Sequence, residues 1–283
     1  MRSGGRETAA QQPITDDTLV AELADLWLRQ LRAESRLENT TINEYERVLS
    51  KLVIPQLGAL RLREVTTSRI DSVLENLRAQ SLNRQRKVKV ITGAMLEMAM
   101  GHGALTVHPV RQAAGVERPH SETRSLTLVD LATVRAAVQA WMAKVRPGPK
   151  ASGDTADLID LMLATGARIG EVLALRWSDV DLDSAQPSLT IGGTVKTEPS
   201  MGTYRKPIPE ASTSFMYLAL PELAAKVLRR RRDSAPGNPI DAVFPTRNGT
   251  WQQVNNVERR WRQIRKDTGL EWVTPHAFRG LLA

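Results

Sequence analysis

The chain has 283 residues, of which 41% are hydrophobic and 25% are charged, the balance of a folded globular protein rather than of a disordered or fibrous one. Its 39 Lys and Arg outnumber its 31 Asp and Glu, and the net charge of +8 favours a polyanionic partner such as nucleic acid. The absence of cysteine excludes disulfide frameworks, thiolate zinc sites and cysteine nucleophiles.

Signals for secretion, membrane insertion and metal binding are missing from the sequence. The N-terminal residues lack the apolar core of a secretory signal, and no apolar run approaches the ~20 residues that cross a bilayer. The four His residues form no pair such as H-E-x-x-H, which leaves little material for a transition-metal site. We therefore expect a cytoplasmic protein with no metal and no membrane partner.

The N-terminal part predicts a helical domain over residues 17–105, behind a polar leader, residues 1–16, that we expect to be disordered. Apolar residues recur at helical spacing in four stretches, 19–31, 45–52, 70–77 and 88–98. The second helix is expected to end before Pro55, because proline interrupts helical hydrogen bonding. Four helices with short connections predict a small bundle.

Two basic clusters lie on predicted helices. The first stands at the start of the fourth helix and suits contacts to DNA phosphates, with an ordinary solvated face as the alternative; it consists of Arg84, Arg86, Lys87 and Lys89. The second is the run of four arginines at 229–232, near the end of a later helix. Cations there offset the carbonyl end of the helix dipole, so we expect these arginines to be solvated, with phosphate contact as the alternative.

Residues 106–125 mix Arg, Gly, Pro, Glu and Ser without periodicity and predict an interdomain linker. The second domain, residues 126–283, is expected to contain helices near 127–145, 155–165, 168–177, 221–232 and 252–267. Between them lie short β-prone segments at 180–182, 189–191, 203–208 and 215–220, which suggest a small antiparallel sheet. The predicted fold class is therefore mainly α (α+β), in two domains.

Two motifs in the second domain carry side chains suited to phosphate chemistry. Arg168 directly follows the break at Thr165-Gly166, where a planar guanidinium can bind two phosphate oxygens at once. His276 and Arg279 stand three residues apart behind Thr274-Pro275, so one helix face presents a proton donor beside a fixed positive charge. Taken singly, each motif also fits a solvated surface side chain.

In this order the two motifs make the chain resemble the tyrosine recombinase (phage integrase) family, from about residue 18 onward. The helical domain, its P-x-L-G sequence at 55–58 and the segment 105–110 at its end resemble that family too. The resemblance implies a helical core-binding domain and a catalytic domain that together clamp duplex DNA, with a tetramer acting on paired attachment-type sites. Arg168 and Arg279 match the two arginines that bind the scissile phosphate, His276 matches the active-site His, and Glu171 matches the acidic residue that follows the first Arg.

The implied reaction needs neither ATP nor a metal ion. Fixed arginines stabilise the charge that a phosphodiester gains under attack, and a tyrosine phenol forms a covalent 3′-phosphotyrosine intermediate. The family also has a Lys on a β-hairpin, often within K-T-x-x-S, that protonates the leaving 5′ oxygen. Aligning on the strand at 217–221 places Glu210 at this position, which we favour; Lys196, which begins K-T-E-P-S, and Lys206 are the alternatives.

The resemblance also implies a nucleophilic Tyr after the His276 motif, whereas the tyrosines present are Tyr45, Tyr204 and Tyr217. We therefore expect this chain to be truncated before the nucleophile and catalytically incomplete. Two alternatives stay open beside a recombinase: a DNA-binding module without catalysis, and a decayed fragment without function.

Overall fold

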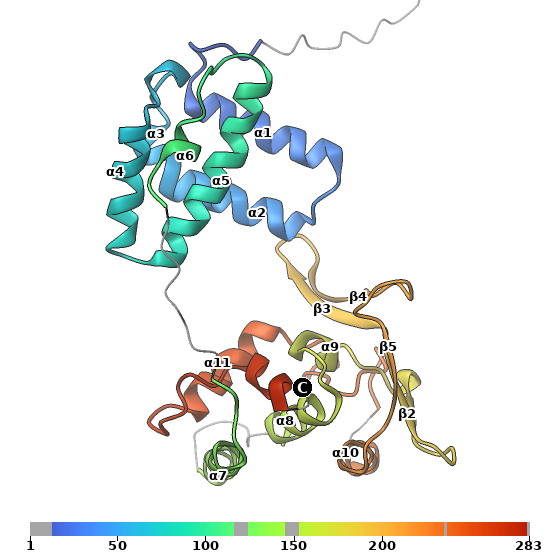
Figure 1. The fold of residues 1–283 in the computed structure, drawn as a ribbon. Helices are drawn as coiled ribbons and strands as arrows, with labels where there is room; N and C mark the ends of the chain where they lie inside the picture. Colours follow the sequence, from blue (N-terminus) through green and yellow to red (C-terminus); the bar gives the residue numbers. More distant parts are fainter. Residues whose placement is uncertain (1–12, 116–123, 145–152, 235–236, 282–283) are drawn as a thin grey trace, which may run out of the picture. The chain divides into compact units, whose positions relative to one another are not determined.

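The computed structural model describes residues 13–115, 124–144, 153–234 and 237–281. The chain divides into two compact units, Met1–Ser121 and Glu122–Ala283 (Figure 1). Each unit has its own cluster of buried hydrophobic side chains. The fold is mainly helical with small antiparallel sheets, which confirms the predicted fold class.

In its described residues, the regular elements of the first unit are all helices or helical turns. Its elements are α1 (Val20–Glu34), α2 (Asn39–Val48), the π-helical η1 (Leu49–Val53), α3 (Ile54–Leu57), the 3-10 turn η2 (Leu62–Glu64), α4 (Thr67–Arg78), α5 (Leu82–Gly101) and α6 (Pro109–Gln112). Thr66 and Ser81 cap α4 and α5, because their side chains accept backbone N–H groups of the first turn. One face of each helix enters the core, as the apolar spacing predicts.

Three features of this unit differ from the prediction. The second helix does not end before Pro55: η1 loosens the helical hydrogen bonding, and Pro55 then stands in the first turn of α3, where a missing N–H costs little. Helix α6, inside the predicted linker, packs against α4 and α5 and buries Val110. Ile14, inside the predicted leader, is also buried in the core. Residues 1–12 and 116–123 lie outside the described residues.

The second unit combines helices with two small sheets. Its elements are α7 (Leu128–Ala143), α8 (Asp154–Thr165), α9 (Ile169–Leu173), the 3-10 turn η3 (Trp177–Asp179), β1 (Val180–Asp181), β2 (Ser188–Ile191), β3 (Gly193–Glu198), β4 (Gly202–Pro207), β5 (Met216–Ala219), α10 (Glu222–Ser234), α11 (Val254–Ile264) and the 3-10 helix η4 (Pro275–Leu281). Strands β1, β2 and β5 form an antiparallel sheet, and β3 pairs with β4 as a separate hairpin.

The prediction missed β3 and made α9 too long. Gly192 and Gly193 suggest a turn, and the residues after them are mostly polar. In the structure Val195 is the only deeply buried side chain of β3, so the sequence gives little sign of a strand. Helix α9 ends at Leu173 because the chain then turns to bond with a later segment, through Trp177 N–H to Asp241 O (2.8 Å) and Val243 N–H to Leu175 O (2.9 Å).

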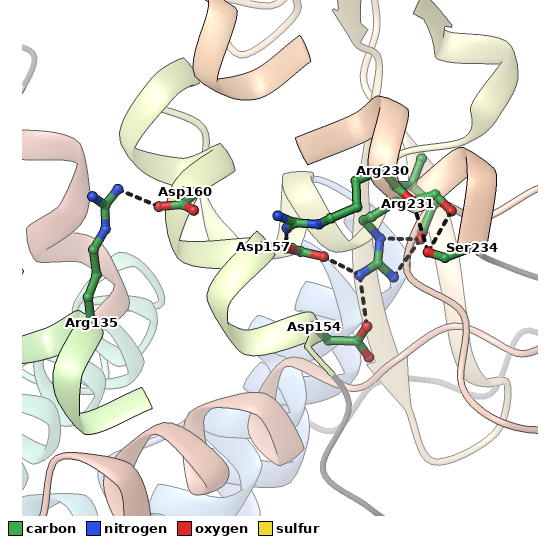
Figure 2. A network of polar contacts seen from close by, with 8 residues as sticks. Arg135, Asp154, Asp157, Asp160, Arg230, Arg231 and Ser234 are labelled. Carbon is green, nitrogen blue, oxygen red and sulfur yellow. Dashed lines mark hydrogen bonds and ion pairs between the residues drawn. The ribbon is translucent and has the colours of Figure 1, made fainter. Parts of the chain in front are cut away.

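Helices α8 and α10 are joined by a network of buried charges (Figure 2). Arg231 Nη1 donates to Asp154 (2.9 Å) and Asp157 (2.8 Å), and its other nitrogens donate to Val243 O. Its guanidinium also lies 4.0 Å from the centroid of the Phe244 ring. The expectation that the arginines at 229–232 are solvated is therefore wrong for Arg231.

Within the described parts of the chain, no helix has the length and apolar character needed to cross a membrane.

Candidate active site

Arg168 stands between α8 and α9, on a backbone break that its neighbours stabilise. Gly166 ends α8 in the left-handed region (φ +67°), which glycine adopts without the steric cost of a Cβ. The Thr165 hydroxyl donates to Leu161 O (2.6 Å) and accepts the Ala167 N–H (3.2 Å). Arg168 is extended (φ −74°, ψ 152°) and directly precedes the first turn of α9. The turn thus presents its side chain at a helix start, as the sequence predicts.

Glu171 holds Arg168 in place. One carboxylate oxygen accepts the Arg168 backbone N–H and the other accepts its guanidinium, both at 2.8 Å. Glu171 is buried, whereas the Arg168 side chain keeps 54% exposure, so the pair fixes the guanidinium and leaves much of its surface to solvent. The same Nη1 also donates to the Ser214 hydroxyl at 3.3 Å. Ser214 comes from the loop before β5, and no sequence signal pointed to it.

Arg279 reaches the same place from the far end of the unit. Its Nε donates to Gly166 O at 2.6 Å, two residues before Arg168. This bond uses one of three guanidinium nitrogens. The structure therefore holds the Arg279 guanidinium at the turn that carries Arg168, although 110 positions of sequence lie between the two arginines.

The helix that carries Arg279 is anchored by Phe278. Phe278 is buried and packs edge-on against Trp261, with 5.5 Å between ring centroids. Trp261 donates its indole N–H to Val273 O (2.7 Å) and is itself buried in the core. In a 3-10 helix residues i and i+3 are eclipsed, which puts His276 and Arg279 on one side of η4. His276 is exposed.

The alternatives for the lysine position occupy different structures. Lys196 lies on β3 of the β3–β4 hairpin, and Lys206 lies on β4. Glu210, which the alignment favoured, lies in an exposed turn after β4. Lys196 and Lys206 therefore share one hairpin, and which of the three residues takes the family's lysine position stays a prediction.

The three tyrosines have separate environments. Tyr45 stacks on Trp27 in the first unit, with 5.6 Å between ring centroids. The Tyr204 hydroxyl donates to Glu198 at 2.5 Å, and Tyr217 is exposed on β5. None of these contacts involves Arg168 or Arg279.

The four DNA-contact candidates of the first unit divide into two pairs. Lys87 Nζ lies 2.6 Å from Glu44 Oε1, and Lys89 Nζ donates to the carbonyls of Ala113 (3.0 Å) and Ala114 (2.6 Å). Both lysines therefore bind neighbouring elements of their own unit. Arg84 and Arg86 are exposed. Arg84 donates to Gln80 at 3.4 Å, a contact too long to compete with a phosphate.

Among the described residues, no group of three or more His, Asp or Glu side chains is arranged to hold a metal ion. The polar groups around Arg168 are cations, a buried carboxylate already bonded to Arg168, and a hydroxyl. This set suits an anion.

Comparison with known proteins identifies relatives for both units. The model of the phage integrase family matches residues 135–283, and that of the phage integrase central domain matches residues 20–116. "Tyrosine recombinase XerC" of Xanthomonas campestris is 26% identical, over 98% of this chain and 78% of the relative. The same-named protein of Xylella fastidiosa is 24% identical, over 92% and 81% of the two chains.

Solved structures with the same fold are integrases. The Tn1549 transposon integrase in complex with a circular intermediate DNA has a TM-score of 0.75 and 16% identity, covering 92% of this chain and 84% of that one. A lambda integrase tetramer bound to a Holliday junction has a TM-score of 0.68 and 17% identity, covering 94% and 72%. At this level of identity the likeness concerns the fold.

Proposed function

The chain belongs to the phage integrase family of site-specific DNA recombinases, and we propose that Arg168 and Arg279 bind the scissile phosphate of its DNA site. The observation that carries this proposal is the Arg279 Nε to Gly166 O bond of 2.6 Å, which holds the second guanidinium at the turn that carries the first. Glu171 orients Arg168 without covering it. Two fixed guanidinium groups match the oxygens of one phosphodiester.

Each side chain has a distinct role in the proposed reaction. The family's attacking group is a tyrosine, and its phenolate oxygen forms the bond to phosphorus. As that bond forms, Arg168 and Arg279 stabilise the charge that grows on the non-bridging oxygens. The bond from phosphorus to the 5′ oxygen breaks, and Lys196 gives that oxygen a proton. His276, on the same side of η4 as Arg279, donates a hydrogen bond to the phosphate.

The remaining assignments follow the family. We assign residues 17–105 to core-site DNA binding and residues 126–283 to catalysis, on attachment-type duplex sites in the cytoplasm. A lambda integrase neighbour is a tetramer on a Holliday junction, and we propose a tetramer on DNA here as well. Arg84 and Arg86 are the exposed cations that we assign to phosphate contacts in the first unit.

A binding experiment tests the phosphate assignment without requiring cleavage. A duplex bound by residues 1–283 is first selected from a random library, and each phosphate is then replaced in turn by an uncharged methylphosphonate. For the unchanged protein, one replacement should weaken binding about 10-fold or more, the worth of a charge-assisted hydrogen bond. Arg168→Ala and Arg279→Ala should each bind more weakly and lose their sensitivity at that same phosphate.

Arg232→Ala is the matched control. This arginine is also half-exposed in the second unit, but it pairs with Asp183 through two bonds of 2.9 and 3.1 Å. It should keep the full response to the methylphosphonate. The proposal fails if Arg168→Ala and Arg279→Ala lose their sensitivity to the methylphosphonate at different phosphates, or if either variant keeps the full sensitivity. In both cases the two arginines do not bind one phosphate together.

A further inference from the structure

The β3–β4 hairpin has two faces that differ in what they contact. Its register pairs Thr194 with Lys206, Val195 with Arg205 and Lys196 with Tyr204. Directly paired residues share a face, and successive residues alternate, so Lys196 and Lys206 lie on the face of Thr194, and Arg205 lies on the face of Val195. One face thus carries the lysines, and the other is partly buried.

The lysine face borders the start of α9. Thr194 Oγ1 lies so close to Gly170 that a Cβ on Gly170 would stand 2.9 Å from it. Gly170 is two residues after Arg168, and β3 and α9 pack together. Lys196 is two residues beyond Thr194 on the same face, about 7 Å along the strand. Its distance from Arg168 therefore depends on how the hairpin is held against α9.

Arg205 is the side chain that ties the hairpin to the other end of α9. Its Nε donates to Ala174 O (3.0 Å), and its Nη2 donates to Asp179 Oδ2 (3.2 Å). Both side chains of the ion pair are only 12% exposed. Ala174 directly follows α9, so the five-residue helix has Arg168 at its start and the Arg205 contact at its end.

Gly193, at the base of β3, leaves room for this contact. A Cβ at this position would stand 2.5 Å from Arg205 Cζ and Nε, closer than any real contact. The guanidinium therefore lies directly over the glycine backbone. An alanine would have to displace Arg205 from Ala174 and Asp179.

We propose that Arg205 is a positioning residue that sets the place of Lys196 relative to Arg168 by fixing the base of the β3–β4 hairpin to the end of α9. The inference rests on the proposed function of Lys196 and Arg168, and adds a residue that does not touch the DNA. A guanidinium suits this positioning role because its separate nitrogens donate to a carbonyl and to a carboxylate at the same time, whereas the charge and the donors of an ammonium are centred on one nitrogen. A buried ion pair contributes little net stability, so its effect on geometry is the property to measure.

The test uses residues 1–283, the selected duplex and the scissile methylphosphonate duplex. For each protein, the response is the factor by which the methylphosphonate weakens DNA binding. Coupling is the factor by which a substitution reduces that response. It is measured for Lys196→Ala and, separately, for Arg168→Ala. In the otherwise unchanged protein both substitutions should show coupling. In an Arg205→Lys background the Lys196 coupling should fall at least 3-fold, while the Arg168 coupling stays within error. Gly193→Ala should reproduce this pattern, because it displaces the same guanidinium.

Arg231→Lys is the matched control. Arg231 is likewise a buried arginine that bonds a backbone carbonyl and aspartates, but it joins α8 to α10 (Figure 2). It should leave the Lys196 coupling unchanged. Hydrogen exchange without DNA gives a second measurement: Arg205→Lys should increase exchange within residues 193–207 and not in α8 or α10.

The outcomes separate this inference from the proposed function. If Arg168 shows no coupling to any phosphate, the proposed function itself fails. If Arg168 couples but the Lys196 coupling is absent or does not respond to Arg205→Lys and Gly193→Ala, Arg205 does not position Lys196. Equal losses at Lys196 and Arg168, or unchanged exchange in the hairpin, would also overturn the inference.

Discussion

At the scale of single residues, the arginines of the second unit differ in what their guanidinium groups can still reach. Arg168 bonds a buried carboxylate and keeps half of its side chain exposed, whereas Arg231 has its nitrogens bonded to two aspartates and a carbonyl. The sequence identified Arg168 through the glycine before it. It could not identify the partners of Arg231, because Asp154 and Asp157 lie more than 70 positions away.

Glu44 illustrates how such contacts change a titration. Its carboxylate accepts two bonds from Arg47, both 2.9 Å, and one from Lys87, 2.6 Å. Hydrogen bonds from Arg47 and then from Lys87 lower the pKa of Glu44 from 4.5 to about 2. Because the folded pKa lies below the unfolded one, the stabilisation is fully present above about pH 4.5 and is lost as the pH falls through about 2.

We predict that Glu44→Gln lowers the free energy of unfolding by about 1–2 kcal/mol at pH 7, after allowance for solvent screening of a side chain one-third exposed. The difference from the unchanged protein should shrink below pH 4.5 and vanish near pH 2. Urea denaturation across this range measures it. Glu75→Gln is the control, because that carboxylate is 73% exposed and lies 3.9 Å from Arg78. A Glu44→Gln deficit that persists at pH 2 would mean that the lost contact is not ionic.

At the scale of elements, local signals predicted most helices and four of the five strands in the described residues, but they missed β3. Helices α4 and α5 carry both a capping side chain and an apolar face, so two independent signals agree. Strand β3 begins with a glycine and mixes its β-branched residues with Lys196 and Glu198, without a strict alternation of apolar and polar residues, and it is held by pairing with β4. Because Lys196 lies on that strand, missing β3 also hid the hairpin that carries two of the three candidates for the lysine position.

Helix α5 shows the same limit for charge. Its cations are adjacent in sequence, yet Lys87 binds Glu44 of α2 and Lys89 binds the carbonyls after α6, while Arg84 and Arg86 face solvent. Composition alone does not distinguish the four cations. Helical spacing separates them only once the neighbouring helices are known.

We predict that the double variant Arg84→Ala/Arg86→Ala weakens DNA binding and reduces the slope of log affinity against log salt by up to about 2, since each lost phosphate contact contributes about 0.9. The variant Lys87→Ala/Lys89→Ala removes the same charge from the same helix and is the matched control. It should lower the melting temperature while changing the slope by less than half as much. Fluorescence anisotropy between 50 and 200 mM salt measures the slopes. Equal slopes for the two variants would contradict the assignment of Arg84 and Arg86 to phosphate contacts.

At the scale of the whole molecule, the two hydrophobic cores belong to separate units. Every buried residue of one core lies within residues 14–113, and every buried residue of the other lies within residues 126–278. Apolar burial is the main favourable contribution to folding, so each unit has its own source of stability. We therefore expect fragments 1–121 and 122–283 to unfold as separate cooperative transitions.

These fragments permit a last prediction about how the chain binds DNA. The first unit offers Arg84 and Arg86, and the second offers Arg168, Arg279 and Lys196, so both have cations for the same duplex. Once one unit is bound, a covalent connection keeps the other at a high effective concentration. Residues 1–283 should therefore bind the selected duplex at least 100-fold more tightly than either fragment, with a salt slope close to the sum of the fragments' slopes. An equimolar mixture of the two fragments, each first shown to melt cooperatively, should bind no more tightly than the better fragment. If one fragment alone reproduces both the affinity and the salt slope of the intact chain, the other unit does not contribute to binding. The prediction that both units bind the same duplex would then be wrong.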